Sequence, residues 1–68
     1  MILTVHDGKL VVMNGSDNVV AVVTSVEEFN ALAEANGGSM LVSSSVDFPE
    51  ESTSDPVVIA LANAIRGL

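Results

Sequence analysis

The stretch from Asp55 to Leu68 constrains the fold most, because it predicts an almost wholly apolar helix in a very short chain. Asp55 is a favoured N-cap residue, and Pro56 fits the first helical position, where its missing N–H costs nothing. Gly67 is a typical residue for a helix end. Between these signals only Asn63 and Arg66 are polar. We therefore expect the helix to have apolar neighbours on more than one side.

Two arrangements of this helix remain open. One face has the spacing of a helix that packs on a sheet, and it consists of Val57, Val58, Leu61, Ile65 and Leu68. Most of the remaining surface comes from Ile59, Ala60, Ala62 and Ala64. In the first arrangement the chain buries the helix by itself. In the second, one side packs on the sheet and the other on a second chain. The length favours the second, since a domain of this size buries only about 60% of its unfolded surface.

The sequence lacks the disulfides and metal ligands that usually stabilise a small domain. The 68 residues include no cysteine, which excludes disulfides and zinc sites with cysteine ligands, and only one histidine, which excludes a histidine-rich metal site. Self-association, or docking on a larger protein, is the remaining way to stabilise the fold.

Residues 1–24 predict a three-stranded meander. Asp7-Gly8 is a two-residue hairpin turn of the type that requires φ > 0 at both positions. This turn pairs Val5 with Leu10, and Leu3 with Val12, on one face. Residues 14–18 are all turn formers. The third strand, V-V-A-V-V-T over 19–24, is apolar on both faces, which predicts that both faces of the sheet are covered.

The remaining elements follow from local signals. Ser25 to Glu28 is a capping box that begins a helix over 25–37, with the Glu28 side chain expected to return to the backbone of Ser25. A strand over 39–46, an acidic loop over 47–55 and the helix over 56–67 come next. The chain is thus predicted to be one small α+β domain over 1–68, in the order β-β-β-α-β-α, with a mainly antiparallel sheet and two helices.

Apolar residues that such a domain cannot cover predict a partner or oligomer interface. They are Val11, Met13, Val19, Ala21 and Val23 on the second face of the sheet, with Ile59, Ala60 and Ala64 on the last helix. The expected partner is a protein, either a second copy of the chain in a homo-oligomer or a larger assembly on which the chain docks.

The formal net charge is −7, because nine carboxylates face only two basic residues, Lys9 and Arg66. Direct binding to nucleic acid or to anionic membranes is not expected, since both depend on Lys and Arg. The first residues lack the basic and apolar regions of a signal peptide, and no stretch approaches the length of a membrane span. The localisation stays open, with a cytoplasmic or virion-associated protein as the default.

No residue set predicts catalysis, a cofactor or a metal. His6-Asp7 is the one place where a base adjoins a carboxylate, but neighbours on a strand point to opposite faces, so their side chains are not expected to orient each other. The acidic residues of the loop over 47–55 lack the alternating ligands and central glycine of an EF-hand. A solvated loop and a weak divalent-cation site are the alternatives there. We expect a protein that is not an enzyme.

These observations favour a non-enzymatic interaction or assembly subunit, for example a small phage virion, capsid-associated or accessory structural protein. The alternative is an acidic inhibitor, including one that imitates DNA as phage anti-defence proteins do. It would bind a basic surface of a host nucleic-acid enzyme through an acidic contact loop that contains Asp47, Glu50 and Glu51. Apolar assembly would survive salt, whereas contacts of this loop would be screened.

Overall fold

The computed structural model describes residues 1–67, and over this range the fold is α+β, as predicted. The described part contains one sheet of four strands, three α-helices and one short 3-10 helix. In chain order the elements are β1 (Ile2–His6), β2 (Lys9–Met13), β3 (Val19–Val22), α1 (Val26–Ala35), β4 (Leu41–Val42), α2 (Ser44–Asp47), η1 (Pro49–Glu51) and α3 (Pro56–Arg66).

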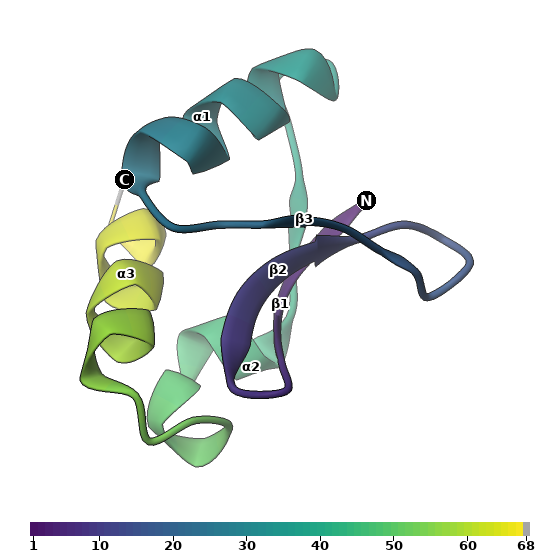
Figure 1. Cartoon of the computed structure of the whole chain (residues 1–68). Helices are drawn as coiled ribbons and strands as arrows, with labels where there is room; N and C mark the ends of the chain where they lie inside the picture. The colour runs from purple at the N-terminus through teal and green to yellow at the C-terminus, as the bar shows by residue number, and fades with distance from the viewer. Residues whose placement is uncertain (68) are drawn as a thin grey trace.

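The sheet has the strand order β3-β2-β1-β4, and it is mixed rather than mainly antiparallel. β2 pairs antiparallel with both β1 and β3, but β4 pairs parallel with β1. The parallel pair arises because the chain crosses from the β3 edge through α1 to the opposite edge, and so returns beside β1 in the same direction (Figure 1). The expectation of a mainly antiparallel sheet is corrected by this crossover.

The β1–β2 hairpin has the predicted turn and register. Asp7 has φ 53° and Gly8 has φ 75°, the left-handed values that a type I′ turn requires. Val5 pairs with Leu10, and Leu3 with Val12, as the two-residue turn predicts.

The core lies between the helices and one face of the sheet, which we call the inner face. α1 and α3 lie on this side in Figure 1, and the turn between β2 and β3 projects on the other. The core cluster consists of Leu3, Leu10, Val12, Val23, Val46, Ala62 and Ile65. None of the residues of α1, all of which the structure describes, is fully buried. Phe29 and Leu32 are partly buried and pack against the core. The helix layer therefore closes the inner face only in part.

α3 begins and ends with the predicted signals. Asp55 Oδ1 accepts a hydrogen bond from the Val57 N–H at 2.9 Å, Pro56 occupies the first turn, and Gly67 is the C-cap. The buried side of the helix differs from the prediction. Val57 is 71% exposed, and Ala62 is buried beside Ile65. Leu68, which was predicted to belong to the core face, lies outside the described residues.

The segment over 39–55 departs most from the prediction. Only Leu41 and Val42 form a strand in the range 39–46. The chain then turns into α2, whose Val46 is fully buried, and Pro49 begins η1 in the range that was predicted to be a loop. Burial of Val46 and Pro49 outweighs the weak strand preference of the preceding serines.

Of the two hydrogen bonds predicted for the capping box of α1, one is confirmed and the other is corrected. Ser25 Oγ accepts from the Glu28 N–H at 3.1 Å, as predicted. The Glu28 carboxylate, however, accepts from Thr24 rather than Ser25, through the Thr24 backbone N–H at 2.9 Å and the Thr24 hydroxyl. Both bonds hold the pKa of Glu28 below its ordinary value of 4.5, and the bond from the hydroxyl has the larger effect.

Gly8→Ala is expected to lower the free energy of unfolding by about 1–2 kcal/mol, because a side chain in the left-handed region clashes with the following carbonyl. Gly15→Ala is the matched control. Gly15 has no left-handed φ, and among the described residues no heavy atom lies within 4 Å of the position that its Cβ would take. Urea unfolding measures both variants. Equal losses would show that the backbone of the turn is not responsible.

Glu28→Gln is expected to lower the free energy of unfolding at neutral pH, with less effect as the pH falls. A pKa below 4.5 in the folded chain means that the ionised carboxylate stabilises the fold above that pH. The stabilisation is lost as the pH falls through the lowered pKa. Urea unfolding of both proteins from neutral pH down to about pH 3 measures the difference. A difference that stays constant over this range would contradict the role of the carboxylate charge.

Candidate protein interface

The face of the sheet opposite the helices, which we call the outer face, is largely aliphatic. The strand register places its residues. Thr4 pairs with Val11, and Val11 pairs with Val22, so these three side chains lie in one row. The complete outer face, from β3 to β4, contains the aliphatic residues Val19, Val22, Val11, Met13, Ile2 and Leu41, with Thr4 and, at the hairpin end, His6 and Lys9.

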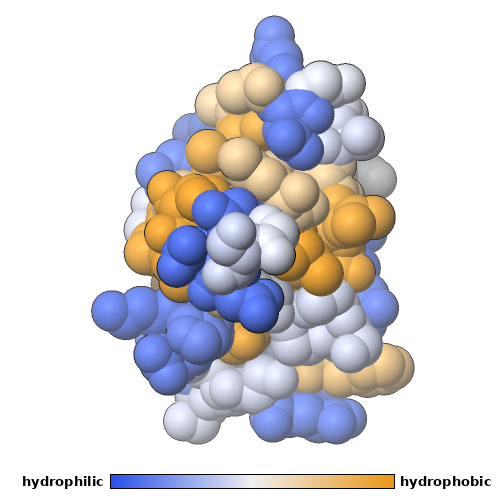
Figure 2. All heavy atoms as spheres, turned by 90° about the vertical axis from the view of Figure 1, so that its right-hand side faces the viewer, coloured by the Kyte–Doolittle hydropathy of each residue, from blue (hydrophilic) through white to orange (hydrophobic). Residues whose placement is uncertain are grey.

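The two edges of this face are the most exposed. Leu41 on β4 is 71% exposed, whereas Val19 and Val22 on β3 are 45% and 47% exposed. Val11, in the middle of the sheet, is only 2% exposed. Figure 2 views the molecule from the right-hand side of Figure 1, which the helices do not cover, and hydrophobic surface lies on both sides of a hydrophilic projection there. The outer face therefore presents aliphatic surface to solvent at both edges of the sheet.

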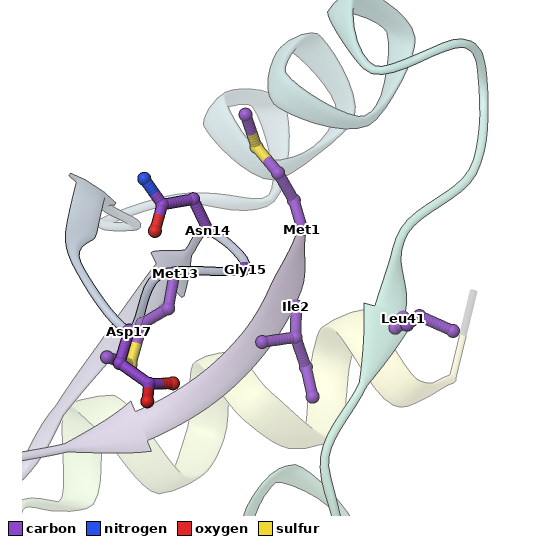
Figure 3. A pocket seen from close by; sticks show the side chains of 7 residues that line it. All are labelled: Met1, Ile2, Met13, Asn14, Gly15, Asp17 and Leu41. Carbon is purple, nitrogen blue, oxygen red and sulfur yellow. The ribbon is translucent and has the colours of Figure 1, made fainter.

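A shallow hollow of about 250 Å³ lies between these edges. Its walls come from the start of β1, from β4, and from the end of β2 with the turn that follows (Figure 3). Met1, Ile2, Met13 and Leu41 supply the apolar part, and Asn14, Gly15 and Asp17 the polar part. Asn14 Oδ1 holds this turn in place by accepting from the N–H groups of Ser16 at 2.9 Å and Asn18 at 3.1 Å.

β3 is an edge strand without a charged residue. The Val23 N–H donates to the Leu10 carbonyl at 2.8 Å, which places the backbone groups of Val23 toward β2. Because the two sides of a strand alternate along an antiparallel ladder, the N–H and C=O of Val22 point away from β2. In Figure 1 β3 crosses in front of the other strands, and no described element lies in front of it. β3 thus offers an open edge of backbone donors and acceptors between valine side chains.

Two further hollows border β3 on the helix side of the sheet. One, of about 220 Å³, lies beside α1 and is lined by Met1, Val20, Leu32, Ala35 and Asn36. The other, of about 270 Å³, lies between the end of β3 and α3, and its lining includes Lys9, Val22, Val23, Val57 and Leu61. These hollows continue the apolar surface of β3 from its edge toward the helices.

The structure separates the residues that were predicted as one sheet surface. Val11, Met13 and Val19 lie on the outer face, as expected. Ala21 pairs with Val12, and Val23 belongs to the core, so both lie on the inner face. The reason is a register shift between Val12 and Met13, which changes the alternation along β3. The assignment of Ala21 and Val23 to the second face is corrected accordingly.

The predicted helix residues lie apart from the outer face. Ala60 and Ala64 are exposed on α3 and Ile59 is half-buried, and α3 packs on the other side of the sheet. Sequence reasoning missed Val22 and Leu41 as exposed residues of the outer face. Val22 could have been found from its pairing with Val11, but Leu41 depends on the parallel pairing of β4 with β1.

The acidic contact loop is a short helical segment in the structure. Asp47 ends α2, Glu50 and Glu51 lie in η1, and all three are exposed. Phe48, between them, is 55% exposed. Arg66 Nη1 donates to the carbonyl oxygen of Asp47, which ties this segment to α3. Among residues 1–67 no group of three or more metal-binding side chains could hold an ion.

His6 and Asp7 lie closer together than was predicted. Asp7 belongs to the turn rather than to a strand, and its left-handed φ brings Asp7 Oδ2 within 3.6 Å of His6 Nε2. The distance exceeds the hydrogen-bond range, and both side chains are at least half exposed. The contact is therefore a solvated pair at the hairpin turn.

Three hydroxyl groups attach β4 and α2 to β1. Ser45 Oγ accepts from the Val5 N–H at 2.9 Å and lies 3.0 Å from Thr4 Oγ1. Ser43 Oγ donates to Thr4 Oγ1 at 2.9 Å and lies 2.6 Å from Ser45 Oγ. Backbone bonds pair β4 itself with β1, from the Leu41 N–H to Met1 O at 3.4 Å and from the Ser43 N–H to Leu3 O at 2.9 Å, and the hydroxyl cluster attaches the chain that follows β4.

Comparisons with protein families, curated proteins and solved structures find no match to this chain. Within the described range, no helix has the length and apolar character needed to cross a membrane.

Ser45→Ala is expected to lower the free energy of unfolding by about 1–3 kcal/mol, because it leaves the half-buried Val5 N–H and Thr4 hydroxyl without this partner. Ser44→Ala is the matched control at the neighbouring, exposed position and is expected to stay within about 0.5 kcal/mol of the parent. Thermal or urea unfolding measures both. A neutral Ser45→Ala variant would show that the hydroxyl cluster does not hold the chain that follows β4.

Proposed function

We propose that this protein is a non-enzymatic interaction or assembly subunit that associates with protein through the outer face of its sheet and the edge strand β3. The observation that carries the proposal is an aliphatic sheet face that no described helix covers, next to an open and uncharged edge strand. Extended apolar patches on small soluble proteins mark interaction surfaces. Self-association and docking on a larger protein are both forms of this function.

The size of the chain supports the proposal. The helices α1 and α3 lie on the inner face, and α1 has no fully buried residue along its described length. A small domain with one incompletely covered face and one open face gains stability by burying that surface against a partner. The formal charge of −7 opposes close approach of two copies, but the exposed valines of β3 carry no charge.

Self-association is expected in sedimentation experiments over a range of protein concentrations, and added salt is expected to maintain or strengthen it. Apolar burial does not depend on charge, while salt screens the repulsion between two acidic chains. The double variant Val19→Ser/Val22→Ser is expected to weaken association by on the order of tenfold or more, because each copy loses two exposed aliphatic side chains.

Phe48→Ser is the control for this experiment. Phe48 is 55% exposed, more than Val19 or Val22, but it lies in the acidic segment and not on the sheet. Its replacement is expected to leave association unchanged. A well-folded protein that stays monomeric at every salt and protein concentration would contradict self-association through the sheet.

A second candidate function is an acidic inhibitor of a protein with a basic surface. The observation in its favour is the exposed Phe48 between the exposed carboxylates of Asp47, Glu50 and Glu51, since an apolar anchor with a polar rim is typical of an interface. The same sedimentation experiment separates self-association through the sheet from this second function. Under this second function the chain alone stays monomeric, and both the serine double variant and Phe48→Ser leave its sedimentation unchanged.

A further inference from the structure

We propose that Asn14 is a site of self-modification, at which the backbone nitrogen of Gly15 displaces the side-chain amide and converts the residue to aspartate and isoaspartate. An asparagine followed by glycine favours this intramolecular reaction, because glycine has no side chain beside the attacking nitrogen and its backbone is the most adaptable. The chain contains two such dipeptides, at 14–15 and 36–37. Their surroundings in the fold differ, and the difference assigns the reaction to the first. This inference does not depend on the proposed function.

The reaction requires only water as a co-reactant, since nucleophile and electrophile are adjacent in the chain. The Gly15 N–H gives its proton to hydroxide, and the nitrogen attacks Cγ of Asn14, so that the carbonyl electron pair moves onto Oδ1. Collapse of this oxyanion breaks the bond from Cγ to Nδ2, and the nitrogen takes a proton from water and leaves as ammonia. Water then opens the cyclic imide. Attack at Cγ breaks the new bond and gives aspartate, whereas attack at the backbone carbonyl carbon breaks the original peptide bond and gives isoaspartate.

The turn that contains Asn14 supplies hydrogen-bond donors to the atom on which charge develops. Asn14 Oδ1 accepts from the backbone N–H of Ser16 at 2.9 Å and from that of Asn18 at 3.1 Å. Backbone donors held in place around an oxygen that becomes negative stabilise the transition state, as in an oxyanion hole. Both bonds are present before the reaction and strengthen as Cγ is attacked. The turn therefore lowers the barrier for attack on its own asparagine.

The attacking and the leaving nitrogen are both unrestrained. The backbone bonds that close the turn run from the Asn14 N–H to Asn18 O and from the Asp17 N–H to Asn14 O. No hydrogen bond among residues 1–67 uses the Gly15 N–H or Asn14 Nδ2. In Figure 3 the Asn14 amide nitrogen points away from Leu41. Gly15 is exposed, and apart from its chain neighbours no described heavy atom lies within 4 Å of the position of a Cβ there, so the backbone has room to move toward Cγ.

The second dipeptide, Asn36-Gly37, is restrained at both nitrogens by the end of α1. The Gly37 N–H donates to Glu34 O at 3.2 Å, and Asn36 Nδ2 donates to Ser39 O at 3.0 Å. Both bonds must break before the Gly37 nitrogen can attack and the amide nitrogen can leave. In the described part of the chain, no N–H donates to Asn36 Oδ1. We therefore expect Asn36 to react more slowly than Asn14 by on the order of tenfold or more.

The reaction changes both the charge and the shape of the turn. Each conversion adds one carboxylate to a chain whose formal charge is −7, and places it with Asp17 at the rim of the hollow on the outer face. Isoaspartate also lengthens the main chain between β2 and β3, because the backbone then runs through the former side chain. Under the proposed function, the modified residue lies at the edge of the associating surface.

Peptide mapping by mass spectrometry tests the inference on the full chain. The folded protein is incubated for days at neutral and at mildly alkaline pH, and a parallel sample is held unfolded in guanidinium chloride. In the folded protein, aspartate and isoaspartate are expected to accumulate at residue 14 faster than at residue 36 by on the order of tenfold. The rate is expected to rise with pH, because the attacking N–H must lose its proton. In guanidinium chloride the two sites are expected to react at similar rates. A folded protein whose two sites react at the same ratio as in guanidinium chloride, or faster at Asn36, would overturn the inference.

Gly15→Ala tests whether the Gly15 nitrogen is the nucleophile. Gly15 has no left-handed φ and has space for a methyl group, so the variant is expected to fold, which urea unfolding checks. The methyl group hinders approach of the nitrogen to Cγ, and conversion of Asn14 is expected to slow several-fold. Asn36 in the same variant is the internal control, and its rate is expected to equal that of the parent. Conversion of Asn14 at the parent rate would show that ammonia is lost without attack by this nitrogen, which overturns the inference.

Discussion

The turn at Asp7-Gly8 is the constraint on which the rest of the structure depends. Its two left-handed residues allow one register between β1 and β2. Because side chains alternate along a strand, this register assigns Leu3 and Val12 to the helices and Val11 to the opposite face. A slip by one residue would exchange the two faces. β3 and β4 then take their own inner and outer sides from their pairing with this hairpin.

Once the faces are assigned, the length of the chain decides what can be covered. α1 and α3 pack on the inner face, but two hollows remain beside β3, and α1 buries none of its described residues completely. No comparable layer of helix is left for the outer face. The aliphatic residues there, Val22 and Leu41 above all, remain exposed. The open surface therefore follows from a sheet that is apolar on two sides in a chain too short to cover both.

Local signals in the sequence were enough for the hairpin, the start of α1 and both ends of α3. Each of these depends on residues close together in the chain, such as Ser25 and Glu28 or Asp55 and Val57. The parallel place of β4 could not be predicted in this way, because it depends on contacts about forty positions apart: the backbone bond from the Ser43 N–H to Leu3 O and the hydroxyl bonds of Thr4 with Ser43 and Ser45. The side of β3 that faces the core could not be predicted, for a different reason. A strand that is apolar at every position carries no alternation to show which side faces the core, and a register shift then decides it.

Under the proposed function, two opposing terms control how this surface meets a partner. Natural edge strands are protected by charges, prolines, short length or β-bulges; β3 carries no charge and no proline, but it has only four residues and a register shift near its start. The chain nevertheless carries nine carboxylates, none of them in β3, and Asp17 and Glu27 are the nearest in sequence to its two ends. In the proposed association, the summed charge of the nine carboxylates opposes contact between copies at low salt and low concentration, while the strand itself carries none of this charge. If the proposed association holds, repulsion beside the apolar edge makes it depend on salt and on protein concentration.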